Sequence, residues 1–458
     1  MINKKMLRKI VGVILGVSML GTTLAGCSGK NDAPSVSNEQ TQSKENTGSD
    51  SKVKSEEKFT LTYATTGLQV TGDGSPRDIN AQNSIDYYEE KFKELYPNAT
   101  LELVSIPGNQ YEELFRAKYS SQTLEDVVHL NVTNPKQYMK AGLLVDLSDQ
   151  PWVQDVLPAA EETCMYDGKW YAAPQAVTAY GVFYNKDIFE KYNLEVPNTW
   201  AELMDVCETL KENGITPFLG GFKDTWLLQS AFEKGCVCPY LQTKYKDPTE
   251  AIYNGEITWD GPEMKVALDK FTELIRKGYY NADCLSIGWE QSIEVFKAGD
   301  AAMYINGSFF PGAVDTQEKQ MNLGFFAMPN DDGTQKFVAA ANAQWGVNAQ
   351  SEHVEAAIDL VNIMSSKEAI EIANNNVNLS AFSNTNVEQA NPVMNEIAEL
   401  LNTSETVNNM AYATGSASNK LYQELLTKII AGKDLEESDM ADVQMLQEQD
   451  KSLVIAPE

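Results

Sequence analysis

Histidine is almost absent from this chain of 458 residues, which contains only His129 and His353. A Ser-His-Asp or Cys-His arrangement would have to use one of these two side chains. His129 lies in an apolar, strand-like run and His353 precedes an amphipathic stretch, so we interpret both as structural. The chain also lacks a Gly-x-Ser-x-Gly elbow, a His-Glu-x-x-His motif and a phosphate-binding Gly-x-x-x-x-Gly-Lys-Ser/Thr loop. We therefore expect no catalytic constellation and no cofactor.

Cysteine is scarce as well. Five cysteines follow Cys27, and they are Cys164, Cys207, Cys236, Cys238 and Cys284. An odd number of cysteines cannot pair completely, and Cys236 and Cys238 are too close in sequence for an ordinary structural disulfide. With only two histidines available, a zinc site also lacks ligands. We expect mostly free thiols and no bound metal.

Basic residues are few compared with acidic residues. The chain has 36 lysines and arginines against 65 aspartates and glutamates, a formal net charge of −29. This balance disfavours nucleic acid and anionic membrane surfaces as partners. A glycosidase needs only two carboxylates at a suitable distance, so a chain with this many acidic residues could contain such a pair. However, most of them fall at exposed helical positions, and solubility explains them better. We predict that the protein is not an enzyme.

Long apolar runs are missing except near the N-terminus, where basic residues precede the apolar stretch from Ile10 to Leu20. This pattern is typical of a secretory signal and is too short to span a bilayer as a mature helix. The run Leu24-Ala25-Gly26-Cys27 that follows resembles a bacterial lipobox. The resemblance implies a signal peptide over residues 1–26 and a lipidated Cys27. An ordinary cleaved signal peptide followed by an incidental cysteine is the alternative.

Residues 27–57 are rich in Ser, Asn, Gln, Lys, Glu, Asp and Gly. Such a composition cannot bury enough apolar surface to offset chain entropy, so we expect a disordered tether. The expected organisation is therefore a globular body outside the cell, held at the cell membrane by a lipid on Cys27.

The body begins with alternating strand and helix patterns. Strands are predicted at 59–64, 101–106 and 126–130, and helices at 84–96 and 110–121. The alternation then restarts with a strand at 180–184 and a capped helix from Thr199 to about Lys211. A helix between Pro262 and Gly278, strands at 301–305 and 323–326, and a helix at 354–364 follow. This order predicts an α/β fold with two halves.

Several short motifs occur in an order typical of one family. They are Tyr96-Pro97-Asn98, Ala141 to Leu147, Tyr166 to Pro174, Phe183 to Phe189, Phe296 to Met303, Ile305 to Ser308 and Trp345 to Asn348. With these motifs the chain resembles the family-one extracellular solute-binding proteins of ABC importers, the group of maltodextrin and other oligosaccharide binders. The likeness extends from about Phe59 to the C-terminal helices.

The resemblance implies a two-lobed periplasmic-binding-protein-like fold of type II, with a hinge of several crossing segments and a ligand cleft between the lobes. Lobe 1 is expected at residues 58–172 plus about 334–383, and lobe 2 at 173–333 plus about 384–458. The crossings are expected near 171–179, 328–333 and 384. The implied partners are a carbohydrate and the permease subunits in the membrane. The two lobes are expected to close on the carbohydrate by a hinge motion, and the permease is expected to recognise the closed form. A monomer is expected.

Carbohydrate recognition needs flat apolar surfaces for sugar faces and planar polar groups for hydroxyls. The residues predicted to bind ligand are Asn131, Tyr180, Trp226, Trp289, Ser308, Phe309, Trp345 and Asn384. Packing in the core is the competing interpretation for each tryptophan. Three alternatives to the sugar receptor remain: a receptor for another solute such as a peptide, a surface glycosidase, and a sensor subunit for a membrane kinase. Few basic residues occur in the expected cleft loops, Lys223 being the clearest, which disfavours a phosphorylated ligand.

Overall fold

The computed structural model describes residues 53–66, 79–130, 135–245, 248–315, 320–375, 378–387, 389, 391–403, 406–407, 416–436 and 438–452. Cys27, the proposed signal and Asn131 lie outside the described residues. Within those ranges, none of the helices combines the length and the apolar character that crossing a bilayer requires.

A single mixed sheet runs through the described structure in the strand order β2-β1-β3-β10-β6-β8-β7. These strands are β1 (Thr60–Thr66), β2 (Thr100–Ile106), β3 (Val127–His129), β6 (Ala173–Asn185), β7 (Thr216–Phe218), β8 (Ala301–Gly307) and β10 (Phe337–Val347). The strands β9 (Leu323–Phe326) and β11 (Leu379–Ser380) pair with β6, and β12 (Thr406–Val407) pairs with β10. A separate hairpin joins β4 (Met165–Tyr166) to β5 (Lys169–Trp170). The outer pairs β1–β2, β1–β3 and β7–β8 are parallel, whereas β6 and β10 run antiparallel to their sheet neighbours β3, β8 and each other.

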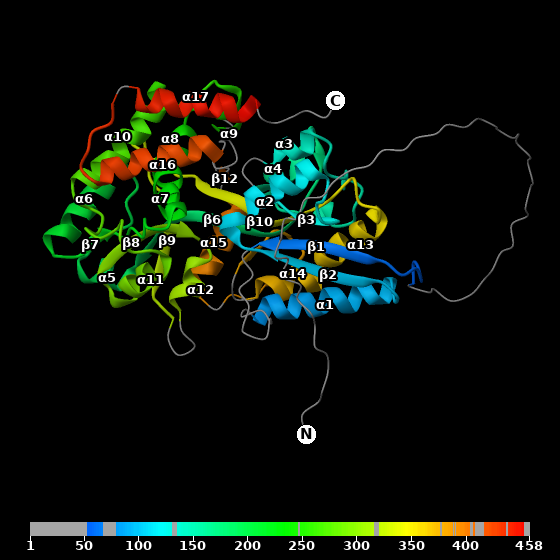
Figure 1. Cartoon of the computed structure of the whole chain (residues 1–458). Helices are drawn as coiled ribbons and strands as arrows, with labels where there is room; N and C mark the ends of the chain where they lie inside the picture. Colours follow the sequence, from blue (N-terminus) through cyan, green and yellow to red (C-terminus); the bar gives the residue numbers. More distant parts are fainter. Residues whose placement is uncertain are drawn as a thin grey trace, which may run out of the picture.

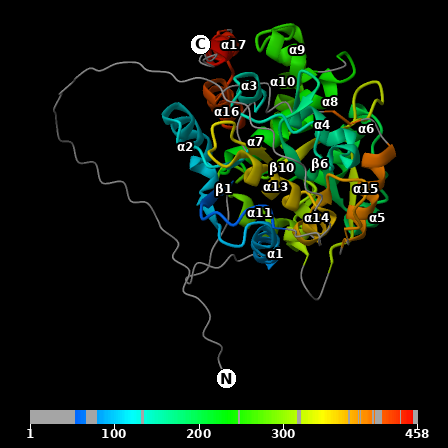
Figure 2. The same cartoon turned by 90° about the vertical axis from the view of Figure 1, so that its right-hand side faces the viewer.

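The helices form two groups around this sheet, which Figure 1 shows as a left and a right body. The first body, on the right, contains α1 (Ile79–Leu95), α2 (Gly108–Ser121), α3 (Lys136–Lys140), α4 (Pro158–Cys164), α13 (Val354–Met364) and α14 (Lys367–Asn374), with the 3-10 turn η1 (Val153–Asp155). The second body contains α5 (Lys186–Lys191), α6 (Trp200–Glu212), α7 (Thr225–Phe232), the π-helical turn η2 (Glu233–Val237), α8 (Cys238–Leu241), α9 (Pro248–Asn254), α10 (Pro262–Arg276), α11 (Trp289–Ala298), α12 (Phe310–Val314), α16 (Ser416–Ile430) and α17 (Asp439–Ser452). Helix α15 (Pro392–Thr403) lies near the middle. Seen from the side, α1, α13 and α14 lie together in the first body (Figure 2).

Each body has its own hydrophobic core. Along β6 the core membership changes between Val177, which packs in the first body, and Ala179, which packs in the second. Along β10 the change falls between Val338 in the second core and Ala339 in the first. These two antiparallel strands therefore enter both cores and join the bodies. The lobe boundaries taken from the family resemblance remain a prediction.

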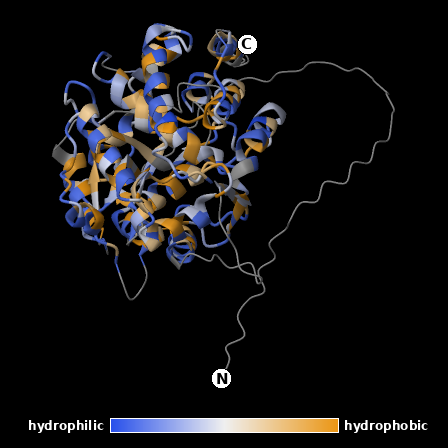
Figure 3. Cartoon of the chain, turned by 90° about the vertical axis from the view of Figure 1, so that its left-hand side faces the viewer, coloured by the Kyte–Doolittle hydropathy of each residue, from blue (hydrophilic) through white to orange (hydrophobic). Residues whose placement is uncertain are grey.

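Local sequence signals explain where several elements begin. The Thr199 hydroxyl accepts a hydrogen bond from the Glu202 N–H (3.2 Å), and the Glu202 carboxylate accepts one from the Asn198 N–H (2.7 Å), so the predicted cap starts α6. The distribution of hydropathy agrees with this fold. The interior strands are mostly apolar, and the surrounding helices carry both polar and apolar residues (Figure 3). The predicted strand at 180–184 proves to be the second half of the longer β6, and the helix predicted from 84 begins at Ile79.

Candidate functional site

Four of the predicted side chains meet in the second body. We call Tyr180, Trp226, Trp289 and Phe309 the aromatic cluster. The ring centroids of Trp226 and Trp289 are 5.5 Å apart, and those of Trp226 and Phe309 are 6.1 Å apart. Phe309 lies 5.8 Å from Trp289 and 6.5 Å from Tyr180, with both of these ring pairs in edge-to-face geometry. The cluster thus draws one ring from each of β6, α7, α11 and the segment after β8.

Two loops held together by backbone hydrogen bonds place the two tryptophans side by side. The Phe222 N–H donates to the Cys284 carbonyl (2.7 Å), and the Lys223 N–H donates to the Ile287 carbonyl (3.1 Å). The Asn281 side chain strengthens this pairing, because it accepts from the Gly220 N–H (2.7 Å) and donates to the Gly220 carbonyl (3.1 Å). We call residues 219–224 and 281–288 the paired loops. Because α7 and α11 start directly after them, Trp226 and Trp289 emerge next to each other.

Asp224 links the end of the first paired loop to the start of α11. Its Oδ2 accepts a hydrogen bond from the Trp289 N–H at 2.7 Å. A negative charge at this place also interacts favourably with the N-terminal end of the helix. Gly288 leaves the necessary room, since a Cβ there would lie 2.6 Å from Asp224 Oδ2. The backbone position of Trp289 is therefore fixed by one carboxylate.

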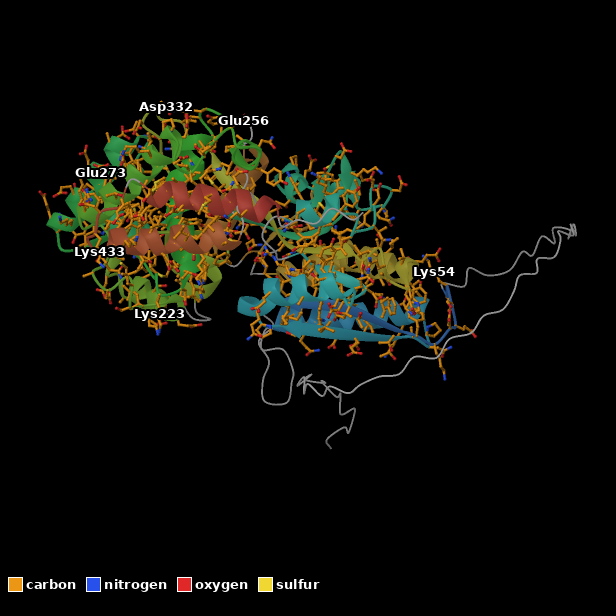
Figure 4. All side chains as sticks on the ribbon, turned by 45° about the horizontal axis from the view of Figure 1, so that its top comes forward. Lys54, Lys223, Glu256, Glu273, Asp332 and Lys433 are labelled. Atoms are coloured by element: carbon orange, nitrogen blue, oxygen red, sulfur yellow. The ribbon has the colours of Figure 1, made fainter. Side chains whose placement is uncertain are left out.

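The aromatic cluster is open to solvent at Trp226. Among the described residues four large apolar side chains are exposed, and Trp226, at 40%, is the only aromatic one. Trp289, Phe309 and Tyr180 are half-buried behind it. An exposed indole backed by three further rings is a surface on which a flat apolar ligand face can pack. Lys223, three residues before Trp226 in the chain, is exposed and points outward at the edge of the second body (Figure 4).

A buried ion pair lies against the cluster. The Lys234 Nζ is 3.3 Å from Glu233 Oε2 and 5.0 Å from the centroid of the Tyr180 ring. The side chains of Lys234 and Glu233 are 5% and 0% exposed. Glu233 Oε1 also accepts hydrogen bonds from the Gln229 side chain (3.0 Å) and from the Tyr422 hydroxyl. Burial is the main cause that raises the pKa of Tyr180, so its phenol stays protonated at neutral pH.

Two other predicted residues make hydrogen bonds that do not involve the rings of the aromatic cluster, although Ser308 directly precedes Phe309. Ser308 is 2% exposed, and its hydroxyl accepts a hydrogen bond from the Ala179 N–H of β6 (3.3 Å). Asn384 is exposed and donates to the Asp155 carboxylate (2.8 Å). Ser308 thus fastens the end of β8 to β6, and Asn384 contacts the first body. Their roles in ligand binding stay predictions.

Trp345 belongs to the core of the first body. It is 6% exposed, and its ring lies 4.8 Å from His129 and 6.4 Å from Tyr63. Within the described residues, neither Trp345 Nε1 nor His129 Nδ1 has a hydrogen-bond partner. Burial lowers the pKa of His129 to about 4, so the imidazole is neutral at physiological pH. His129 is therefore a neutral core residue, as a structural role requires.

The thiols offer no reactive centre in the described structure. Cys164, Cys207, Cys236, Cys238 and Cys284 are all buried and free. Burial raises the pKa of the Cys164 and Cys236 thiols to about 12, and a protonated thiol is a poor nucleophile and metal ligand. Over the same residues, the acidic, histidine and cysteine side chains form no group that could hold a metal ion.

Sequence reasoning missed Asp224 and the pair Glu233–Lys234. A signal for the pair was present, because two adjacent charges interrupt a mostly apolar stretch from Trp226 to Leu241. A run of that kind is buried, and buried charges are normally paired or functional. No comparable signal marks Asp224, whose partner lies in a different loop.

Comparison with known proteins gives consistent matches over most of the chain. The family model described as bacterial extracellular solute-binding protein matches residues 79–371. An uncharacterized ABC transporter extracellular-binding protein of Pyrococcus horikoshii is 23% identical over 423 residues, covering 90% of this chain and 92% of the relative. The multiple sugar-binding protein of Streptococcus mutans is 21% identical over 292 residues, or 61% of this chain and 67% of the relative.

Solved structures share the fold. The crystal structure of a sugar transporter of Bacillus licheniformis in complex with stachyose superimposes with a TM-score of 0.67 at 19% sequence identity. The match covers 85% of this chain and 100% of that one. The two-lobed architecture expected from the sequence is thus confirmed at the level of the fold.

Proposed function

This chain belongs to the bacterial extracellular solute-binding proteins, and from that premise we propose that it captures a carbohydrate outside the cell and delivers it to the permease of an ABC importer. Its ligand would be an oligosaccharide. The proposal describes capture and release without chemical conversion of the ligand.

The aromatic cluster is the observation that carries this proposal. Sugar rings present apolar C–H faces that pack on aromatic side chains. An exposed tryptophan that contacts other rings offers an aromatic face on which a sugar ring can pack. Trp226 and Trp289 lie side by side with ring centroids 5.5 Å apart, so a sugar that packs on the exposed Trp226 lies close to a second indole. The name of the Streptococcus mutans relative and the stachyose complex of the Bacillus licheniformis protein support the same class of ligand.

The joining strands suggest how capture is communicated. Short stretches of β6 and β10 and the segment from Leu379 to Ala381 pass between the two cores, so a small change in twist there would rotate one body against the other. A ligand held between the aromatic cluster and the first body would favour the closed arrangement, which the permease would recognise. We also propose that Asn131, Trp345 and Asn384 contact the ligand.

A screen of thermal stability tests the proposed ligand class. The soluble body, beginning near residue 53, is melted with raffinose, stachyose, xylan and chitin oligosaccharides, peptides and polyols. A sugar present at a hundred times its Kd should stabilise the folded state by about 2.7 kcal/mol, which is a clear rise in Tm. Stabilisation by peptides and not by sugars would contradict the proposal. Appearance of shorter sugars in the mixture would reveal a glycosidase instead.

We also propose that the protein is anchored to the outer face of the cell membrane by a lipid on Cys27. The lipobox-like run Leu24 to Cys27 and the polar segment that follows it support this. Replacing Cys27 by Ala should release the protein into the medium with its sugar affinity unchanged and uptake reduced. Unaltered membrane retention would contradict the lipid anchor.

A further inference from the structure

Lys234 has unused hydrogen-bonding capacity at the border of the aromatic cluster. Its ammonium group has three N–H donors, and within the described residues one of them is used, in the bond to Glu233 Oε2 at 3.3 Å. The side chain is 5% exposed, so the remaining two donors are largely shielded from bulk water. Unsatisfied donors this deep in a protein carry a substantial free-energy cost, which a bound acceptor would remove.

The Lys234 side chain extends towards the aromatic cluster. Its Nζ lies over the Tyr180 ring, 5.0 Å from the centroid, and Tyr180 is the half-buried member of the cluster in contact with Phe309. The Lys234 ammonium therefore lies against the Tyr180 ring, and Phe309 connects that ring to the exposed Trp226.

The backbone places Lys234 there by an unusual local structure. Residues Glu233–Val237 form a π-helical turn between α7 and α8, and such turns often occur at functional sites because they re-aim a side chain. Gly235 follows directly, and a Cβ at this position would lie 2.7 Å from the Ile305 side chain of β8. The turn is thus pressed against the sheet at a residue that has no side chain, which brings Lys234 close to β6.

The charges around Lys234 define what it can bind. Glu233 is fully buried and faces the ammonium, while Gln229 and Tyr422 donate to the other carboxylate oxygen. The pair is neutral as a unit, so it provides a strong donor without a net positive charge. An acidic ligand would gain little from it, whereas a hydroxyl or ring oxygen would fit.

We propose that the Lys234 ammonium donates a hydrogen bond to a hydroxyl or ring oxygen of the sugar unit that binds against Tyr180, and that Glu233 restricts the site to neutral sugars. This inference rests on the proposed function and specifies its ligand class. The position also makes Lys234 a selectivity residue, because a sugar without an oxygen at this point would leave the donors unsatisfied.

The test is titration calorimetry on Lys234→Met, which removes the ammonium and keeps the apolar stem. The probe is whichever of raffinose, stachyose, xylotriose or chitotriose gives the largest rise in Tm with the unmodified protein. We expect at least a tenfold loss of affinity, since hydrogen bonds from charged groups are among the strong ones. A trisaccharide of galacturonic acid serves as the acidic probe and should bind more weakly than the neutral sugar.

Two further variants separate binding from folding. Removing one partner of a buried pair destabilises the fold, so Glu233→Gln with Lys234→Met removes both charges together and should show the same loss of affinity. Lys270→Met is the matched control, because Lys270 is a buried lysine that pairs with Asp331 (2.7 Å) and lies over Trp200 (4.1 Å) outside the aromatic cluster. Its sugar affinity should stay within twofold of the unmodified protein.

The outcomes are distinguishable. If the unmodified protein binds none of the sugars, the proposed function fails and this inference fails with it. If the sugar binds and the Lys234 variants bind it equally well, or Lys270→Met loses as much affinity, only the inference on Lys234 is overturned. Tighter binding of the acidic probe would overturn the neutral-ligand assignment.

Discussion

Trp226 is the residue at which exposure and aromatic packing coincide. Its side chain is 40% exposed while its ring contacts Trp289 and Phe309. The other tryptophans of the second body, Trp200 and Trp259, are buried. The exposed part of the indole is open to a ligand, so its replacement should act on ligand binding as well as on the packing against Trp289 and Phe309.

Trp226→Ala should therefore weaken sugar binding by at least fivefold, or about 1 kcal/mol, and lower Tm modestly because two ring contacts are lost. Titration calorimetry with the sugar selected by the thermal screen measures the loss. Met445→Ala is the control, because Met445 is another exposed large apolar residue, 52% exposed on α17. Equal affinities for Trp226→Ala and the unmodified protein would remove Trp226 from the site.

His129 should make the stability of the protein depend on pH. Its pKa in the folded state is about 4, below the value of 6.5 that it takes when unfolded. Above pH 6.5 both states are neutral at this residue. As the pH falls from 6.5 to 4, the unfolded state gains a proton that the folded state does not accept, so the free energy of unfolding decreases.

The difference of about 2.5 pKa units corresponds to about 3 kcal/mol of stability lost by pH 4. Urea denaturation of the unmodified protein and of His129→Leu at several pH values measures it. The variant should lose less stability across this interval, because its side chain cannot take up a proton. Identical slopes for the two proteins would contradict the prediction.

Residue chemistry could be inferred from sequence where it depends on the type of side chain alone. Tryptophans in polar loops suggested stacking surfaces, and Trp226 and Trp289 are indeed brought together. Lys234 could not be placed in the same way, because its orientation depends on a π-helical turn and on packing against Ile305. Neither the turn nor the packing is encoded in a short sequence pattern.

At the scale of elements, the paired loops decide where α7 and α11 start. Asp224 Oδ2 holds the first backbone N–H of α11, at Trp289, from a different loop. Asp224→Ala should free this N–H and let the Trp289 ring move. We expect a loss of stability of about 1 kcal/mol, typical of a removed helix cap, together with a several-fold weaker affinity for sugar.

Chemical denaturation and calorimetry on Asp224→Ala provide the two measurements. Asp269→Ala is the control, since Asp269 is exposed on α10 and pairs with Lys265 of the preceding turn (3.2 Å). The prediction would be wrong if Asp224→Ala kept full affinity, because the carboxylate would then not position Trp289 for binding.

The element pattern was largely predictable because it rests on local signals. The Thr199 cap and the regular apolar spacing of α13 were sufficient to place α6 and α13. The length of β6 was not predictable, since Ala173 to Ala179 has small residues and no alternation. This half is a strand because it pairs with β10 on one side and β11 on the other.

At the scale of the whole molecule, the joining strands predict a motion. Core membership changes within one or two residues in both β6 and β10, so each strand passes directly from one core to the other. A saturating sugar that contacts both bodies should shift the population towards a more compact form.

Small-angle X-ray scattering should accordingly show a smaller radius of gyration with the sugar than without it. Leu114→Ala, which alters an exposed residue of α2, should behave like the unmodified protein. A radius that stays the same at saturation would mean that binding does not involve closure.

Because β6 and β10 each contribute to both cores, neither body corresponds to one continuous piece of the gene. A chimera that exchanged a whole body would need junctions inside both strands, in the middle of a shared ladder. The paired loops, in contrast, enter and leave one body and could be transplanted as short cassettes. New ligand preferences are therefore easier to obtain by recombining loops than by recombining lobes.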